Sequence, residues 1–394
     1  MKMKRLACVS LLMMAMGSGA AFAQTADGLS PFVQIRAYAG WIKQSPAVTG
    51  VEKEADTDFV EQFGTTRFGA KGKYGEFDGY MELGISSSNS SSSNGVSLRK
   101  AYAVWNLSDV ANLKVGQDEA PYTFYANSVT MDCSFNGMGV TSQPRDMHVK
   151  FTYMGAYVDF LSPIAPPAIT YDATAKKSTG ATNWDLLAPK TAIGYDFTSA
   201  DKTVSAGVSA VYQYSVFDGQ KNVAGSTLDA LDDKRVDAGL AAAHVLLNLA
   251  PFSVKADFGY GINTAVLGID YTKSFAKTTT SVGTAAVGIS TAPELNKSAN
   301  GFKNTASMEG FLELAYKMSF AEFRTAVSYV DAKNDNWKKH DQQMGYYLQA
   351  TIPLVEKRFN LIPEICYFDF MDDKAGNNQG YELCGGMLFQ VLLM

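Results

Sequence analysis

The stretch FSVKADFGYGIN at residues 252–263 alternates between two kinds of side chain. Every even-numbered position, from Phe252 to Ile262, is apolar or aromatic, and every odd-numbered position, from Ser253 to Asn263, is polar, charged or glycine. A period of two places these two sets on opposite faces of a β-strand. One face suits lipid or a protein core and the other suits water, so the stretch predicts an amphipathic strand.

The same alternation recurs at residues 204–215 and 343–352. These runs are longer than the usual strand of a soluble protein, which has about 5–6 residues. They match the roughly 9–11 residues that a tilted strand needs to cross a bilayer. After residue 23, no run approaches the ~18 consecutive apolar residues of a membrane-spanning helix. The sequence therefore predicts an all-β fold, a transmembrane antiparallel β-barrel.

Extending the pattern along the chain predicts sixteen strands in a single barrel. Fourteen or eighteen strands stay open as alternatives, because the fifth and seventh segments are weakly patterned. The predicted strands cover residues 32–43, 59–71, 74–85, 96–107, 111–117, 145–154, 156–161, 190–197, 204–217, 234–249, 252–269, 305–320, 322–330, 342–353, 359–371 and 380–393.

The connections between these strands alternate in length. Gly155 and residues 250–251 are very short links, whereas intervening connections such as 86–95 and 162–189 are longer and polar. Outer-membrane barrels have this arrangement of short periplasmic turns and long external loops. An even number of strands then places both termini on the periplasmic side.

The first 23 residues have the three parts of a cleavable signal peptide. Lys2, Lys4 and Arg5 form a positive region, residues 6–15 form a short apolar core, and residues 21–23 form a small-x-small cleavage site. Cleavage leaves residues 24–394 as a single barrel domain of 394 − 23 = 371 residues. Export of a barrel predicts location in the outer membrane of a Gram-negative cell, in contact with its lipid.

Composition argues against several classes of function. The net charge of −5, which becomes −8 without the three signal-peptide cations, argues against a nucleic-acid partner. The three histidines lie in distant segments without a nearby nucleophile pattern, and no metal-binding spacing such as Cys-x-x-Cys occurs. We therefore expect no catalytic residues, no metal site, no cofactor and no enzyme activity.

Three short motifs resemble the trimeric sixteen-stranded porins of Gram-negative bacteria, with some similarity to dicarboxylate-type porins. They are TRFGAKG at residues 66–72, LRKAY at 98–102 and LKVGQ at 113–117. The resemblance covers the whole chain as an architecture and implies a homotrimer of channels. It also implies that the third external loop, about residues 118–144, folds inward and narrows the pore.

In such porins, basic residues on early strands face acidic residues on the inward loop. By position, the resemblance implies a basic wall of Arg36, Arg67 and Arg99, with Lys150 as a weaker fourth member. The implied acidic candidates are Asp118, Glu119 and Asp132. The family's Pro-Glu-Phe-Gly loop motif is replaced here by EAPYTF at residues 119–124.

The alternation of side chains between the two faces of each strand supports the same site independently. Arg36 and Arg67 share a face with polar neighbours, and Glu82 on the third strand takes the inward side. Because Arg99 and Lys100 are adjacent, only one is expected to face inward, and the small residues behind Arg99 favour Arg99. Residues 118–144 are too long for a simple connection and too aromatic for disorder, as expected of a loop packed inside the barrel.

Cations on one wall facing carboxylates set up a transverse field that orients water and dipolar solutes. The leading prediction is a porin for passive diffusion of small hydrophilic solutes through a water-filled, charge-lined pore. Uncompensated arginine instead predicts a channel selective for small anions such as dicarboxylates or phosphate. A structural outer-membrane protein is the third interpretation, and a barrel enzyme is the fourth.

Cys366 and Cys384 fall on the inferred lumen face of the last two strands, each nine residues from the hairpin centre near Ala375. Directly opposed residues of an antiparallel pair have spacings that a disulfide accepts, and the exported compartment is oxidising. The sequence therefore predicts a cross-strand disulfide, with two unbonded thiols as the alternative.

Overall fold

The structure is a computed structural model of the full chain. It describes residues 28–46, 55–87, 95–122, 144–164, 171–172, 177–178, 184–186, 188–217, 233–269, 271–275, 285–289, 291–295, 301–355 and 358–393. The predicted signal peptide, residues 1–23, lies outside the described residues.

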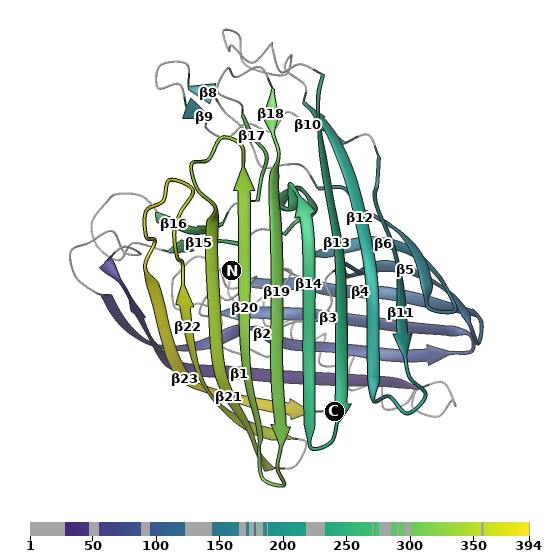
Figure 1. The fold of residues 1–394 in the computed structure, drawn as a ribbon. Helices are drawn as coiled ribbons and strands as arrows, with labels where there is room; N and C mark the ends of the chain where they lie inside the picture. The colour runs from purple at the N-terminus through teal and green to yellow at the C-terminus, as the bar shows by residue number, and fades with distance from the viewer. Residues whose placement is uncertain are drawn as a thin grey trace, which may run out of the picture.

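Sixteen long antiparallel strands form one closed barrel (Figure 1), which confirms the predicted count. Each long strand pairs with the next along the chain, and β23 pairs with β1 to close the ring. The strands are β1 (Leu29–Gln44), β2 (Ala55–Tyr74), β3 (Phe77–Ser87), β4 (Gly95–Ser108), β5 (Ala111–Glu119), β6 (Arg145–Tyr153), β7 (Ala156–Leu161), β11 (Lys190–Thr198), β12 (Val204–Phe217), β13 (Lys234–Leu249), β14 (Phe252–Ile262), β19 (Thr305–Lys317), β20 (Glu322–Asn334), β21 (Asp341–Val355), β22 (Phe359–Asp369) and β23 (Tyr381–Leu393).

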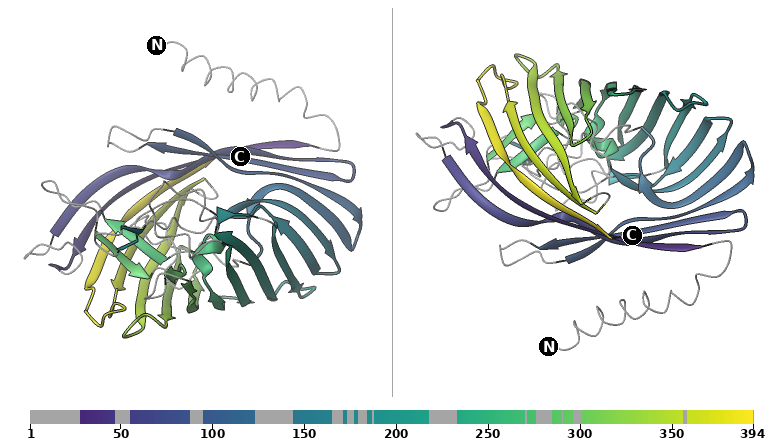
Figure 2. Two further views of the ribbon diagram at one scale, coloured as in Figure 1. Left: turned by 90° about the horizontal axis from the view of Figure 1, so that it is seen from above. Right: turned by 90° about the horizontal axis from the view of Figure 1, so that it is seen from below.

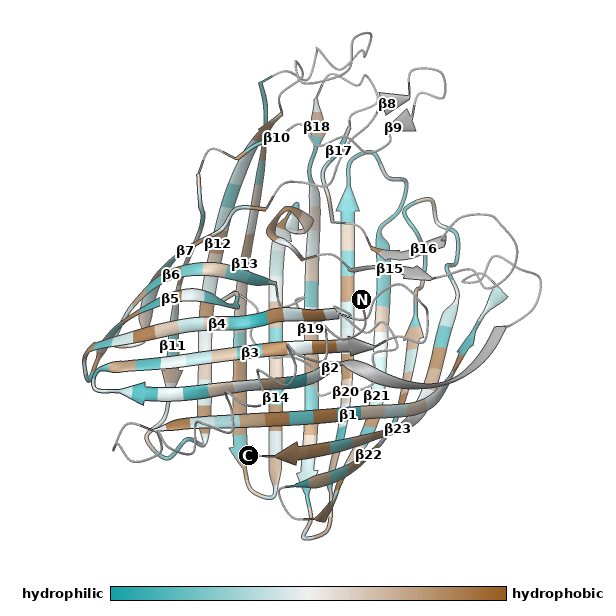
Figure 3. Cartoon of the chain, turned by 180° about the vertical axis from the view of Figure 1, so that it is seen from behind, coloured by the Kyte–Doolittle hydropathy of each residue, from teal (hydrophilic) through white to brown (hydrophobic). Residues whose placement is uncertain are grey.

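Strand β19 illustrates the two faces of the barrel wall. Glu309 and Glu313 point inward and are 3% and 1% exposed, whereas Leu312 and Leu314 point outward and are 41% and 48% exposed. Hydropathy alternates in the same way along neighbouring strands (Figure 3). An apolar outside and a polar inside, with every strand paired on both sides, is the arrangement that a β-sheet needs to cross lipid.

The predicted alternation of short and long connections is present. The hairpin between β6 and β7 turns through Met154 and Gly155, whose φ angles are 50° and 86°. Positive φ at both central residues is the type I′ arrangement, which matches the right-handed twist of the paired strands. At the other end of the barrel, the connection from β5 to β6 spans residues 120–144.

One predicted strand is shorter than expected. The prediction of a strand over 252–269 is wrong beyond Ile262, because Asn263 adopts a left-handed conformation with φ 52° and the chain continues as the 3-10 helix η4 (Thr264–Leu267). All four η4 residues are buried. The sequence TAVL does not alternate, so it has no polar face for the lumen and packs as a compact apolar turn.

The connection from β14 to β19 continues inside the barrel. It contains the hairpin of β15 (Tyr271–Phe275) and β16 (Ala285–Ile289), which lies within the ring of strands when the barrel is viewed from above (Figure 2). The other short elements are β8 (Tyr171–Asp172), β9 (Lys177–Ser178), β10 (Trp184–Asp185), β17 (Glu294–Leu295) and β18 (Phe302–Lys303). Among the described residues, no helix is long and apolar enough to span a membrane.

Candidate pore lining

Glu82 on β3 joins arginines from two neighbouring strands. Its Oε1 lies 2.7 Å from Arg99 Nε on β4 and 3.5 Å from Arg67 Nη1 on β2. The Tyr80 hydroxyl donates to Glu82 Oε2 at 2.8 Å. Because β2, β3 and β4 are adjacent and Glu82 is 3% exposed, this carboxylate is held on the lumen wall by charge-assisted hydrogen bonds.

Arg99 and Lys100 both reach inward partners, in contrast to the prediction that only Arg99 would. The pairing of β3 with β4 changes from Glu82↔Lys100 to Leu83↔Leu98, so Arg99 is an extra residue in a β-bulge. A bulge interrupts the strict alternation of side chains across a strand. Adjacent cations can therefore share one face here.

Lys100 belongs to a second charged group, with Lys114, Asp118 and Glu119. Lys100 Nζ lies 3.1 Å from Asp118 Oδ1 and 3.0 Å from Glu119 Oε2, and Lys114 also pairs with Asp118. Both carboxylates belong to β5, which extends to Glu119, rather than to the predicted loop over 118–144. The structure thus brings two of the predicted acidic residues onto the wall, where they pair with lysines and not with Arg36, Arg67 or Arg99.

Arg36 and Lys150 lie on either side of these two groups. With the Gln390 amide oxygen turned toward it, Arg36 Nη2 lies 3.2 Å from that oxygen on β23. Lys150 on β6 places its Nζ 3.8 Å from the ring centroid of Tyr157. Arg36, Arg67, Arg99 and Glu82 carry three positive charges and one negative charge, so these four residues together have a net charge of 3 − 1 = +2.

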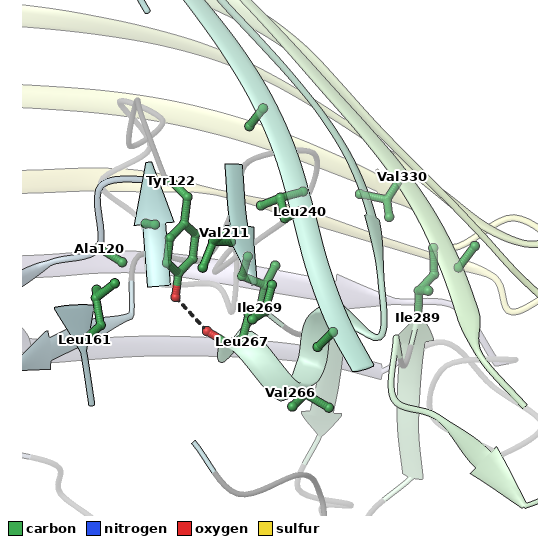
Figure 4. Close-up of a cluster of buried hydrophobic side chains, with 14 of the residues drawn as sticks. Ala120, Tyr122, Leu161, Val211, Leu240, Val266, Leu267, Ile269, Ile289 and Val330 are labelled. Atoms are coloured by element: carbon green, nitrogen blue, oxygen red, sulfur yellow. Dashed lines mark hydrogen bonds between the residues drawn. The ribbon is translucent and has the colours of Figure 1, made fainter. Parts of the chain in front are cut away.

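The predicted inward folding of the third loop falls largely outside the described residues, because 123–143, with Asp132, are not described. Its first residues are described and point inward. Ala120 and Tyr122 are 1% and 0% exposed, and the Tyr122 hydroxyl donates to the Leu267 carbonyl of η4 at 2.8 Å (Figure 4). The start of the third loop is therefore in contact with the segment that enters the lumen after β14.

Lys190 at the start of β11 completes this contact. Its Nζ donates to Asp146 Oδ2 at 2.8 Å, to the Tyr122 hydroxyl at 2.9 Å and to the Leu267 carbonyl at 3.3 Å. Burial raises the pKa of the Tyr122 phenol well above its ordinary value, so the hydroxyl stays a neutral donor. Sequence reasoning missed this group, because its members come from four distant segments and have no shared motif.

His148 on β6 is held between two acceptors of the described residues. It is 2% exposed, its Nδ1 lies 2.6 Å from Asp159 Oδ2, and its Nε2 lies 3.0 Å from the Asp118 carbonyl oxygen. Both ring nitrogens thus face acceptors, which leaves neither available as a base toward a substrate. The geometry is that of a buried structural histidine.

Cys366 on β22 and Cys384 on β23 are directly opposite in the strand register, as predicted. Both are buried, on an apolar part of the lumen wall that includes Tyr38, Phe368 and Leu388. The disulfide itself stays a prediction.

The chain matches no protein-family model and no curated protein. Its fold is similar to three solved outer-membrane proteins. The outer-membrane channel DcaP of Acinetobacter baumannii has a TM-score of 0.68 and 15% identity, over 94% of this chain and 98% of that chain. An anion-selective porin from Comamonas acidovorans has a TM-score of 0.54 and 12% identity, over 93% and 100%. OmpT of Vibrio cholerae, in a trimer form, has a TM-score of 0.51 and 9% identity, over 94% and 100%. The chain thus has the sixteen-stranded porin fold.

Proposed function

We propose that this protein is an outer-membrane porin through which small hydrophilic solutes diffuse passively. The observation that carries the proposal is the division of side chains across a closed wall. Apolar residues cover the outside, as at Leu312 and Leu314, and ionised groups such as Glu82, Arg67 and Arg99 are gathered on the inside. Buried charges of this kind are costly in a packed core but suit the wall of an aqueous passage.

A preference for anions is the second candidate. It is supported by the net charge of +2 on Arg36, Arg67, Arg99 and Glu82, and by the buried Arg67 Nε, which finds no acceptor among the described residues. Guanidinium groups pair well with carboxylates and phosphates because their donors match the spacing of two oxygens. The Comamonas porin of similar fold is described as anion-selective, which is consistent with this candidate.

We also propose a homotrimer in the outer membrane. The trimer form of the Vibrio protein of similar fold supports this assembly, as does the sequence resemblance to trimeric porins. Native mass spectrometry from mild detergent is expected to give three times the mass of the cleaved chain. A monomer mass under the same conditions would contradict it.

Planar-bilayer recording in a salt gradient tests the channel and its selectivity together. Stepwise conductance is expected, with a reversal potential displaced toward that of the anion. Neutralising Arg36, Arg67 and Arg99 together to Gln is expected to move the reversal potential toward zero, because the cationic excess is removed. Absence of stepwise conductance contradicts both candidates, and an unchanged reversal potential contradicts the role of the arginines.

A further inference from the structure

The inward segment, residues 263–304 between β14 and β19, enters the lumen with η4 and with the hairpin of β15 and β16 (Figure 2). Val266, Leu267, Ile269 and Ile289 are all 0% exposed. Strand β16 lies against β20 and β21, on their inner side (Figure 2). External loops that enter a barrel reduce the area through which solutes pass, so the position of this segment bears directly on pore width.

One polar group joins the inward segment to two strands of the wall and to the third loop. The Lys190 cluster consists of Lys190, Asp146, Tyr122 and the Leu267 carbonyl, which come from β11, β6, the third loop and η4. Lys190 and Asp146 belong to the wall. Tyr122 and Leu267 belong to segments that enter the lumen. The same ammonium group thus ties both segments to one side of the barrel.

The surroundings of the Lys190 cluster exclude water. Lys190 and Tyr122 are 0% exposed, and Tyr122 belongs to the same apolar cluster as Val211, Leu240 and Val266 (Figure 4). In such surroundings a charge is retained only when it is paired and hydrogen-bonded. The inward segment supplies one acceptor for Lys190, so its position and the burial of that lysine depend on each other.

The wall beside the inward segment is largely apolar but contains one buried amide, that of Gln343. Gln343 on β21 is 1% exposed, and neither of its amide atoms has a hydrogen-bond partner in the part of the chain that the structure describes. Val330, which is directly opposite Gln343, packs in the same cluster as Ile289 of β16. Water would satisfy the Gln343 amide, which opposes the inward position, whereas the burial of Ile289 against Val330 favours it. The Lys190 cluster adds to the contacts that favour the inward position.

We propose that Lys190, Asp146 and Tyr122 are positioning residues that hold the inward segment and the start of the third loop in the lumen, and thereby set the width of the channel. The proposal rests on the proposed porin function for its effect on solutes. When the cluster is broken, the segment leaves the wall, water reaches Gln343, and the passage widens.

Single-channel conductance tests the effect on pore width. The double variant Lys190→Met/Asp146→Asn removes both charges without leaving one unpaired, and Tyr122→Phe removes only a hydroxyl. Both are expected to give larger conductance steps than the unmodified protein. The matched control is Arg235→Met/Asp237→Asn, an ion pair on the outer side of β13 at 2.6 Å, which is expected to leave conductance unchanged. Unchanged conductance in both folded test variants would overturn the proposal.

Chemical labelling supplies a readout that does not depend on conduction. Gln343→Cys is made in a chain whose Cys133, Cys366 and Cys384 are serine, and its modification by a water-soluble thiol reagent is timed. Breaking the Lys190 cluster is expected to accelerate labelling about tenfold, because local opening exposes the wall. Equal labelling rates with the intact and the broken cluster would contradict the proposal. Accelerated labelling in a protein without conductance would instead contradict only the porin function.

Discussion

Glu82 determines the charge balance of the arginine-lined wall. It compensates two guanidinium groups at once, through Arg67 on β2 and Arg99 on β4. The alternation of side chains along each strand predicts that Glu82 and Arg67 face the lumen. The joint inward position of Arg99 and Lys100 was not predictable in the same way, because it depends on a bulge in the pairing of β3 with β4. Pairing between strands is not a local property of the sequence.

The variant Glu82→Gln is expected to strengthen anion preference. It removes the one carboxylate of this group while keeping an oxygen for Arg99, so the net charge rises from +2 to +3. The anion-to-cation permeability ratio, obtained from reversal potentials, is expected to rise several-fold at low ionic strength, where screening is weak. Asp237→Asn on the outer face serves as the charge-matched control. A ratio equal to that of the control would show that Glu82 does not act on permeating ions.

A separate prediction concerns a disulfide between Cys366 and Cys384. Their directly opposite positions satisfy the register that a cross-strand disulfide requires. Mass spectrometry after alkylation of unreduced, denatured protein from the outer membrane is expected to leave both residues unlabelled and linked. Alkylation of both thiols without prior reduction would rule out the bond.

Strand β14 shows how far a local pattern extends and where it fails. Alternation predicts a strand up to Ile262, and the prediction extends that strand to Ile269. The chain instead turns at Asn263, whose side-chain amide donates to the Asp237 carbonyl and to Asn304 Oδ1, both at 2.8 Å. Its Oδ1 also accepts from the Thr305 amide at 2.9 Å. These partners lie on distant segments, so no local signal marks the turn.

Replacing Asn263 tests the turn that directs the inward segment. Asn263→Ala loses the three side-chain hydrogen bonds and adds a conformational cost of roughly 1–2 kcal/mol at positive φ, whereas Asn263→Gly loses the hydrogen bonds only. Limited proteolysis of the folded protein is expected to cut within the inward segment fastest in the alanine variant, then in the glycine variant. Identical cleavage rates in all three proteins would contradict this role.

At the scale of the whole molecule, the barrel was the most predictable feature. Strand length, alternation and the order of short and long connections are local properties of the sequence. Together they predict a closed barrel of sixteen strands, which the structure confirms. The sequence predicts an inward third loop, but the entry of the segment after β14 is not predictable, because it depends on contacts such as that between Tyr122 and Leu267, 145 positions apart in the chain. The strands therefore account for the barrel, and we expect the segments that enter the lumen to set the pore width.

Solute entry into liposomes tests the central claim most directly. Liposomes that contain the purified protein are diluted into isotonic solutions of uncharged sugars of increasing size, and swelling is followed by light scattering. A porin predicts rapid swelling with the smallest sugars and slower swelling as size increases, because diffusion through a narrow water-filled passage depends on solute size. Swelling no faster than that of protein-free liposomes, with every sugar, would contradict the account.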